Sequence, residues 1–146
     1  MEHIWTVICA NSIVDIDTNN LSLINVVEQF KLPPIIGDSQ PMLLGVTLSI
    51  VSFWRRSNLE IAEGDQEIGV DIVDPKGNKE ENEPMIVSWQ QYSRIRNRIT
   101  LAGLPFNGYG TYWFEVKTKS DGEWKIVARV PVEIVADTIY DTPINA

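Results

Sequence analysis

Three arginines that alternate along one short segment are the residues of this chain best suited to binding chemistry. Arg94, Arg96 and Arg98 are separated by single residues in the segment RIRNRITL. In a β-strand such alternate side chains project from the same face, about 6–7 Å apart. The row of guanidinium groups can therefore form a patch for an anion or for an acidic protein partner. Alternatively, each arginine pairs with an acidic residue of a neighbouring strand, such as Glu115 or Glu133, in pairs worth about 0.2–1 kcal/mol each.

Tryptophan is the second residue type with a potential binding role, because the chain of 146 residues contains five. In the stretch TYWFEVK, alternation places Phe114 in the core and Trp113 on the face that meets water. Three interpretations of Trp113 remain open. It covers Val127 or an arginine side chain across a hairpin, it anchors a subunit interface, or it is a stacking platform for a sugar. Trp124, in contrast, is predicted to belong to the core.

Residue types that carry catalysis are scarce in this sequence. His3 is the only histidine and Cys9 the only cysteine, so nucleophilic catalysis through a Ser-His-Asp or Cys-His arrangement would have to use His3. Cys9 lies in an apolar segment, where a buried thiol is expected. Cysteine and histidine are too few for a zinc site. The sequence therefore predicts no enzyme, with no catalytic, cofactor-binding or metal-binding residue and no cofactor.

A partial calcium-loop pattern occurs near the N-terminus. Asp15, Asp17 and Asn19 have the spacing of the first three ligands of such a loop. The pattern next requires a glycine where Asn20 stands and a glutamate where Val26 stands. The segment is therefore predicted to be a hairpin turn, because asparagine tolerates the left-handed conformation that hairpins need.

Length and composition indicate one ordinary globular domain. Hydrophobic residues make up 44% of the chain and charged residues 22%, and the net charge is -8. An acidic protein is a poor partner for nucleic acid or for anionic membranes, since both attract positive surfaces. No stretch approaches the roughly 20 apolar residues of a membrane span. With a single cysteine and no basic N-terminal region, a cytoplasmic protein is expected.

Short apolar segments separated by turn signals predict an all-β fold. Residues 21–32 keep a helical alternative, because some of their apolar residues have helical spacing. Pro75 and Gly77 predict a turn at 74–78, and residues 80–83 are expected in an acidic loop. The pattern favours an antiparallel, immunoglobulin-like β-sandwich of about 7–9 strands with little or no helix, formed by residues 1–136, with a loose tail at 137–146. The predicted strands are 3–9 with a continuation through 12–16, 21–32, 42–54, 67–73, 85–91, 94–101 and two within 111–134.

Strand alternation also predicts the core. The side chains expected inside, besides Trp124, are Leu48, Ile50, Val70, Ile72, Phe114, Val116, Ile126 and Val130. The final strand is predicted to present an unpaired edge, on which Lys125, Arg129 and Pro131 would block uncontrolled pairing.

Three segments of the chain resemble a known family. They are TVICANSIVD, with a cysteine in the first strand, NLSLINVVEQF after a turn, and LPFNGYGTYWFEVKTKSDGEW near the end. Together they are similar to segments of small uncharacterised bacterial proteins with a sandwich-type fold. Ala10 and Asn11 stand where that family is expected to have acidic residues. The resemblance implies a fold and no activity, so it assigns no functional residue.

The sequence as a whole favours a noncatalytic protein-interaction or assembly domain. Its expected surface combines Arg94, Arg96 and Arg98 with Trp113, on the condition that all four lie on one sheet face. A protein partner or a homodimer is the expected binding partner, and nucleic acid and membrane are not. The alternative is a carbohydrate-binding module that uses Trp113 as its platform.

Overall fold

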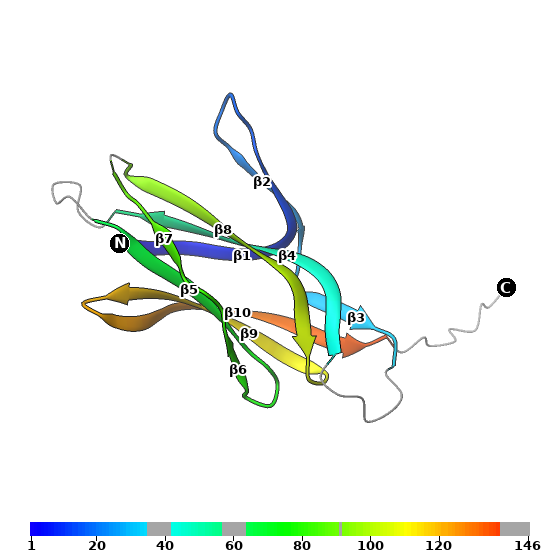
Figure 1. The fold of residues 1–146 in the computed structure, drawn as a ribbon. Coiled ribbons are helices and arrows are strands. Elements are labelled where there is room, and N and C mark those ends of the chain that lie inside the picture. Colours follow the sequence, from blue (N-terminus) through cyan, green and yellow to red (C-terminus); the bar gives the residue numbers. More distant parts are fainter. Residues whose placement is uncertain (35–41, 57–63, 91, 138–146) are drawn as a thin grey trace.

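The protein is a β-sandwich (Figure 1). The structure, a computed structural model, describes residues 1–34, 42–56, 64–90 and 92–137. This part of the chain forms ten strands and contains no helix, which confirms the prediction of an all-β sandwich. The strands are β1 (Glu2–Val14), β2 (Leu21–Val26), β3 (Gln29–Leu32), β4 (Met42–Arg55), β5 (Gln66–Val73), β6 (Lys79–Glu81), β7 (Met85–Val87), β8 (Arg94–Phe106), β9 (Gly110–Ser120) and β10 (Glu123–Ala136).

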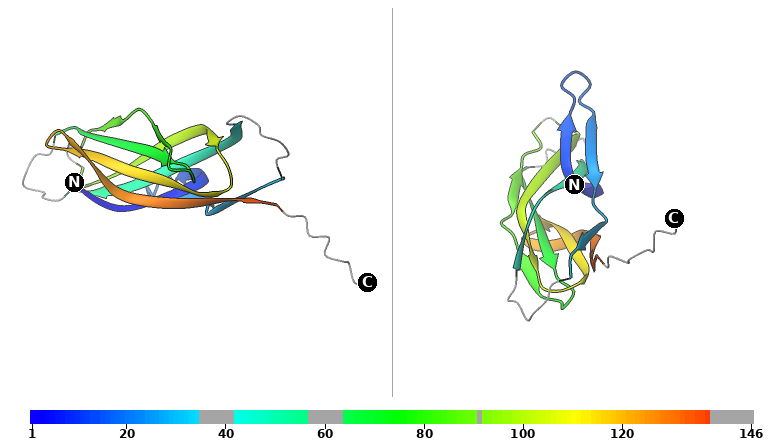
Figure 2. Two further views of the ribbon diagram at one scale, coloured as in Figure 1. Left: turned by 90° about the horizontal axis from the view of Figure 1, so that it is seen from below. Right: turned by 90° about the vertical axis from the view of Figure 1, so that its right-hand side faces the viewer.

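Two sheets pack face to face and are not closed into a barrel (Figure 2). The four-stranded sheet has the order β2-β1-β4-β8. The six-stranded sheet has the order β3-β10-β9-β5-β6, and β7 also pairs with β5. Neighbouring strands are antiparallel except β3 and β10, which are parallel. The strand β8 therefore lies at an edge of one sheet, and β9 lies inside the other.

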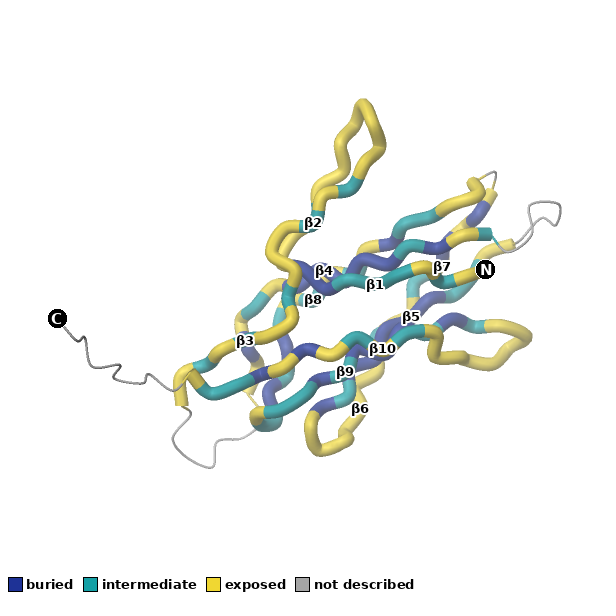
Figure 3. Tube along the Cα trace, turned by 180° about the vertical axis from the view of Figure 1, so that it is seen from behind, coloured by how far each residue is buried: buried dark blue, intermediate teal, exposed yellow. Residues whose placement is uncertain are grey.

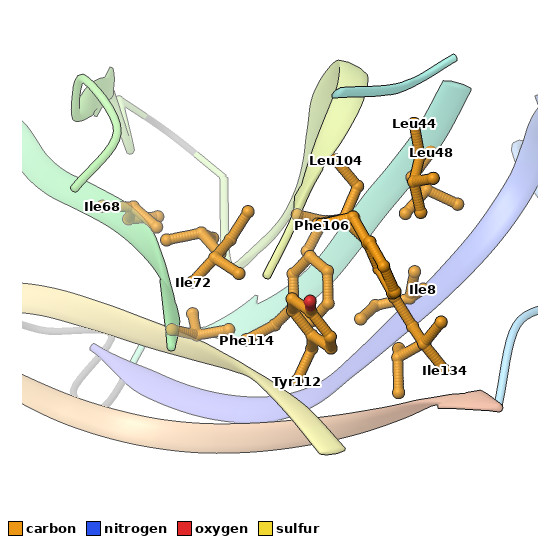
Figure 4. Close-up of a cluster of buried hydrophobic side chains, with 14 of the residues drawn as sticks. Ile8, Leu44, Leu48, Ile68, Ile72, Leu104, Phe106, Tyr112, Phe114 and Ile134 are labelled. Carbon is orange, nitrogen blue, oxygen red and sulfur yellow. The ribbon is translucent and has the colours of Figure 1, made fainter. Parts of the chain in front are cut away.

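The core fills the space between the two sheets (Figure 4). It forms because alternate residues of each strand are apolar and point inward. Phe114 and Tyr112 from β9 are fully buried, as is Trp54 from β4. Val130 is half-buried against the cluster. Six predicted core residues are confirmed as buried: Leu48, Ile50, Val70, Ile72, Phe114 and Val116.

A β-bulge in β10 overturns two core predictions. The register against β9 shifts between Ile126 and Ala128, so Val127 is an extra residue in the strand. An inserted residue reverses the face on which all earlier residues of the strand lie. Trp124 and Ile126 consequently lie on the outer face and are 38% and 50% exposed. The sequence pattern assumed unbroken alternation and was wrong for both.

The segment 21–32 contributes to both sheets. Its first part, β2, pairs with β1 in the four-stranded sheet, and its second part, β3, pairs with β10 in the six-stranded sheet. Asn25 has a φ of 52°, a left-handed conformation that asparagine tolerates better than most residues. The helical alternative for this segment was wrong.

A hydrogen-bonded corner fixes one end of the six-stranded sheet. The backbone N–H of Gly77 donates to the carbonyl of Asp74 at 3.0 Å, so the predicted turn is confirmed. The side chains of Asn78 and Asn107 both donate to Asp74 Oδ2 at 2.8 Å. The Tyr112 hydroxyl donates to the Gly108 carbonyl and accepts from the Asn107 N–H. The corner therefore ties the β5–β6 turn to the β8–β9 turn.

The structure corrects two further predictions about segments, and a third lies mostly outside the described residues. The expected acidic loop at 80–83 was wrong in part, because Glu80 and Glu81 belong to β6. The predicted strand 85–91 is shorter, since β7 ends at Val87. Of the predicted loose tail, residues 138–146 lie outside the described part of the chain, so that prediction stays a prediction.

Candidate binding cleft and its arm

A hairpin arm extends from the four-stranded sheet. The outer part of β1 and all of β2 form this arm, which comprises residues 10–26. Figures 1 and 2 show it projecting away from the body of the sandwich. The two strands pair from Cys9↔Val26 to Val14↔Leu21. The arm therefore offers surface that the rest of the sandwich does not cover, and Figure 3 colours most of it as exposed.

Apolar side chains are concentrated on this arm. Ile16, at the tip, is 96% exposed. Scattered apolar residues are normal on a protein surface, whereas several on one projecting element make it a candidate interaction site. The exposed large apolar residues of the arm are Ile13, Val14, Ile16, Ile24 and Val26.

The tip of the arm is an ordered turn organised by Asp15. Its Oδ1 accepts the backbone N–H groups of Asp17 at 2.9 Å and Thr18 at 2.8 Å. These hydrogen bonds, first of all those from Thr18, hold the pKa of Asp15 below its usual value. Asn19 adopts a φ of 55°. The predicted hairpin turn is therefore confirmed, and hydrogen bonds to Asp15 Oδ1 stabilise it.

The arginine row lies on the edge strand β8 and reaches toward the arm. Arg96 donates to the backbone carbonyl of Asn19 at 2.8 Å and to its side-chain oxygen at 2.6 Å. Arg98 donates to the carbonyl of Ser12 at 3.5 Å. Arg94 is exposed and makes neither a hydrogen bond nor an ion pair with any described residue. Two arginines thus steady the arm, and the third points to solvent.

No carboxylate among the described residues pairs with the three arginines. The predicted partners are in the other sheet, where Glu115 pairs with Lys79 and Arg129. Glu133 accepts a hydrogen bond from the Thr111 hydroxyl. The prediction of cross-strand neutralisation was therefore wrong. Three guanidinium groups have no counter-charge among the described residues, in a protein of net charge -8.

A cleft of about 630 Å³ lies between the arm and the outer face of the four-stranded sheet. Trp5 from β1 and Phe53 from β4 stack in it, with ring centroids 5.6 Å apart and planes at 30°. These two residues are neighbours because they pair in the sheet register. Tyr92 and Arg94 line the cleft as well. On the arm side the lining residues are Val14, Asn19, Asn20 and Leu21, and Ile95 and Arg96 complete it.

Trp113 lies far from this cleft in the topology. It belongs to β9 in the six-stranded sheet, whereas the arginines belong to β8 in the four-stranded sheet. The condition that all four residues share one face is therefore not met, and that prediction was wrong. The Arg129 guanidinium lies over the Trp113 ring, 4.6 Å from its centroid. This is the contact with an arginine across the hairpin that one interpretation of Trp113 expected.

The outer face of the six-stranded sheet carries a network of ion pairs. Asp71 and Glu115 are only 2% and 6% exposed, although they lie on an outer face. Lys117 Nζ lies 2.7 Å from Asp71 Oδ2, and Lys79 Nζ lies 2.7 Å from Glu115 Oε2. A Cβ on Gly69 would lie 2.9 Å from Lys117 Cε. The glycine therefore provides the room in which the lysine crosses the sheet to its partner.

Trp113 and Trp124, the two tryptophans of this face, also make cation–π contacts. Lys117 and Lys119 hold their amino groups 5.0 and 5.7 Å from the centroid of the exposed Trp124 ring. Lys119 also pairs with Glu67 at 3.2 Å. Cation–π contacts of this kind contribute about 0.5–1 kcal/mol at exposed sites. The charges and rings of this face are therefore used for contacts within the chain.

His3 and Cys9 have structural environments. His3 Nε2 is 2.7 Å from Thr6 Oγ1, its ring packs edge-on against Trp54, and burial lowers its pKa. Cys9 is fully buried, as predicted. Its thiol donates to the Ser49 carbonyl at 3.6 Å, and burial raises its pKa. Among the described residues, no group of three or more histidines, cysteines and acidic residues is arranged to hold a metal.

The sequence pointed to the arginines but not to their aromatic neighbours. Trp5 and Phe53 fall on the outward parity of two apolar strands, and alternation cannot show that a hairpin arm rises beside them. The predicted continuation of the first strand through 12–16 likewise gave no sign that Ile13, Val14 and Ile16 are exposed on this arm.

Comparisons with known proteins found no match that would help to interpret this site. No protein-family model matches the chain, and no match was found to a curated protein or to a solved structure. The resemblance to small bacterial sandwich proteins therefore stays a prediction. The residues that the structure describes contain no helical segment with the length and apolar character of a bilayer span.

Proposed function

We propose that this protein is a noncatalytic protein-interaction domain that docks through the arm and the adjoining cleft. The observation that carries the proposal is the apolar arm, whose tip residue Ile16 is 96% exposed. Covering an isoleucine side chain contributes about 1.5–3 kcal/mol. Several such residues lie on one projecting hairpin, so a partner that covers them gains binding free energy from each.

The order of the arm supports this function. A flexible segment loses conformational freedom when it binds, and that loss subtracts from affinity. Here the Asp15 turn orders the tip and Arg96 ties Asn19 to the sheet. The arm is therefore set in one geometry before a partner arrives.

The chemistry of the cleft fits binding better than catalysis. Its lining consists of aromatic, aliphatic, amide and guanidinium side chains. None of these described lining residues is a histidine, a cysteine or a carboxylate, which are the usual general acids, bases and nucleophiles. The interior of a cell remains the proposed location of the protein, on the grounds of its single cysteine.

Site-specific photo-crosslinking in cells that make the protein tests the proposal. A photo-reactive amino acid in place of Ile16 is expected to form a covalent adduct with one defined protein. The matched control is the same substitution at Ile86, which is also apolar and 69% exposed but lies on β7. Equal adducts at both positions, or none at position 16, would contradict a docking role for the arm.

Carbohydrate binding is a second candidate, and the cleft favours it over Trp113. Sugar sites combine an aromatic face with planar polar groups, and Trp5 and Tyr92 here lie beside Asn20 and Arg94. Trp113 is less suited, because Arg129 covers one face of its ring. Titration with a panel of glycans checks this candidate. Saturable binding that is lost in Trp5→Ala and kept in Trp124→Ala supports it, and no binding to the panel removes it.

A further inference from the structure

We infer that the cleft of one copy of this chain receives the arm tip of a second copy. The inference rests on the proposed function and names its partner. It is carried by the match between two surfaces of the same molecule: an acidic tip with an apolar centre, and an aromatic cleft with unneutralised arginines.

The tip consists of the sequence Asp15-Ile16-Asp17. Ile16 is the most exposed of the large apolar residues that the structure describes. The Asp15 carboxylate accepts hydrogen bonds from within the turn. Asp17 makes no ion pair with any described residue. The tip therefore presents one apolar side chain between two carboxylates.

The cleft presents the complementary groups in a similar order. Arg94 is exposed and has no counter-charge in the part of the chain that the structure describes, and Arg96 lies on the same side of β8 two residues further along. Between them and the arm, Trp5, Phe53 and Tyr92 offer aromatic surface. Arginine and carboxylate form two parallel hydrogen bonds, which makes this pair a specific one. Ile16 of the tip can thus enter among the aromatic rings while the neighbouring Asp17 carboxylate meets the Arg94 guanidinium group.

The placement of tip and cleft permits closed symmetry. The cleft is bounded by the arm of its own copy, so each tip lies close to the cleft of the same molecule. A twofold axis between two arms is the arrangement in which each tip enters the cleft of the other copy. The same contact then occurs twice, and the assembly stops at a dimer.

Charge favours the contact between tip and cleft over other orientations of two copies. Each copy carries a net charge of -8, so two copies repel in most orientations. The positive side of the four-stranded sheet is where an acidic tip is attracted. Electrostatic complementarity of this kind sets orientation and suppresses other contacts.

A charge exchange tests the inference. The tip variant Asp17→Lys and the cleft variant Arg94→Glu should each dissociate the dimer, with a dissociation constant raised at least about tenfold. Each homodimer would then contain two repulsive contacts. An equimolar mixture should restore dimers, because both contacts of the mixed dimer again join opposite charges. Sedimentation velocity measures all three samples. The matched control is Lys76→Glu, whose charge lies in an exposed turn of the other sheet, and it should dimerise as the wild type does.

The outcomes separate this inference from the proposed function. A wild-type protein that stays monomeric at about 500 µM overturns self-docking, since mass action should populate even a weak dimer there. Variants that dimerise like the wild type, or a mixture that fails to recover, overturn it as well. In the crosslinking experiment, an adduct of two copies supports the inference. An adduct with a different protein overturns it and leaves the proposed function standing.

Discussion

The two outer faces of the sandwich use their charges in opposite ways. On the six-stranded sheet, Asp71 and Glu115 are buried beneath basic side chains, and Arg129 stacks on Trp113. On the four-stranded sheet, Arg94 has no counter-charge among the described residues, and the stacked Trp5 and Phe53 face an open cleft. Both faces contain tryptophan and cations, so composition alone does not distinguish them.

The difference lies in whether each group has a partner within its own chain. A carboxylate that is removed from water requires a charged or hydrogen-bonded partner, which Lys117 provides for Asp71. Such a face contributes to stability and has little left to offer another molecule. Arg94 and the exposed apolar side chains of the arm have no such partner among the described residues. We expect substitutions on the first face to change the free energy of unfolding, and substitutions on the second to change association.

The largest expected loss in the free energy of unfolding comes from the core that both sheets share. Phe114 is fully buried between the sheets, so Phe114→Ala should lower the free energy of unfolding by about 3–5 kcal/mol. Urea denaturation monitored by fluorescence measures the loss. A loss below about 1 kcal/mol would show that this side chain does not face the interior.

On the six-stranded sheet, Lys117→Met should cost about 3 kcal/mol, because it leaves Asp71 buried without its closest partner. Methionine keeps an apolar stem over Gly69. The matched change on the other face is Arg94→Met, which should alter the free energy of unfolding by less than about 0.5 kcal/mol. Denaturant titration of both variants measures the two changes in the free energy of unfolding. Equal losses would contradict the difference between the two faces.

The corner at Asp74 should make stability depend on pH. Burial raises the pKa of Asp74, but hydrogen bonds from Asn78, Asn107 and Lys76 outweigh it, and the net pKa lies below the usual value. A lowered pKa stabilises the fold above the unfolded value of about 3.9. That stability is lost as the pH falls through the folded pKa. Asp74→Asn places an amide against two amide donors and should cost about 2 kcal/mol at pH 7. Denaturant titrations at several pH values should show this cost shrinking below about pH 3.9, and a constant cost would contradict the ionised corner.

The smallest expected loss of stability on the six-stranded sheet concerns Trp113. Trp113→Leu keeps an apolar side chain and removes the contact with Arg129, so it should cost about 1 kcal/mol. It should leave association unchanged, because the ring lies on the face whose groups are already paired. Thermal unfolding and sedimentation velocity provide the two measurements. Loss of dimers in this variant would place the interface on the six-stranded sheet.

The sequence predicted the sandwich and most of its core because alternation is a local property of each strand. Leu48 and Phe114 could be assigned in this way without knowledge of the neighbouring strands. Trp124 and Ile126 could not, since a single inserted residue at Val127 reverses the face and leaves little trace in the hydrophobic pattern. The split of segment 21–32 between two sheets was hidden for a similar reason, because both halves have strand character.

The candidate site was predictable in part. The spacing of Arg94, Arg96 and Arg98 correctly predicted one strand face. Which strands flank β8 depends on topology, and the sequence carries no direct signal of it. The arginines were therefore assigned acidic partners that belong to the other sheet. The aromatic residues beside them come from two other strands, so no local pattern joins them to the row.

The parallel pairing of β3 with β10 has a consequence for the order of folding. Lys31 and Val135 are register partners, and they are separated by about a hundred residues of chain, a distance that slows the formation of a contact. The arm, in contrast, is a hairpin between adjacent strands and can form within about 1–10 µs. During synthesis at roughly 5–20 residues per second, the arm is complete long before β10 leaves the ribosome. The residues of the arm are thus outside the ribosome for several seconds before the last strand of the sandwich becomes available.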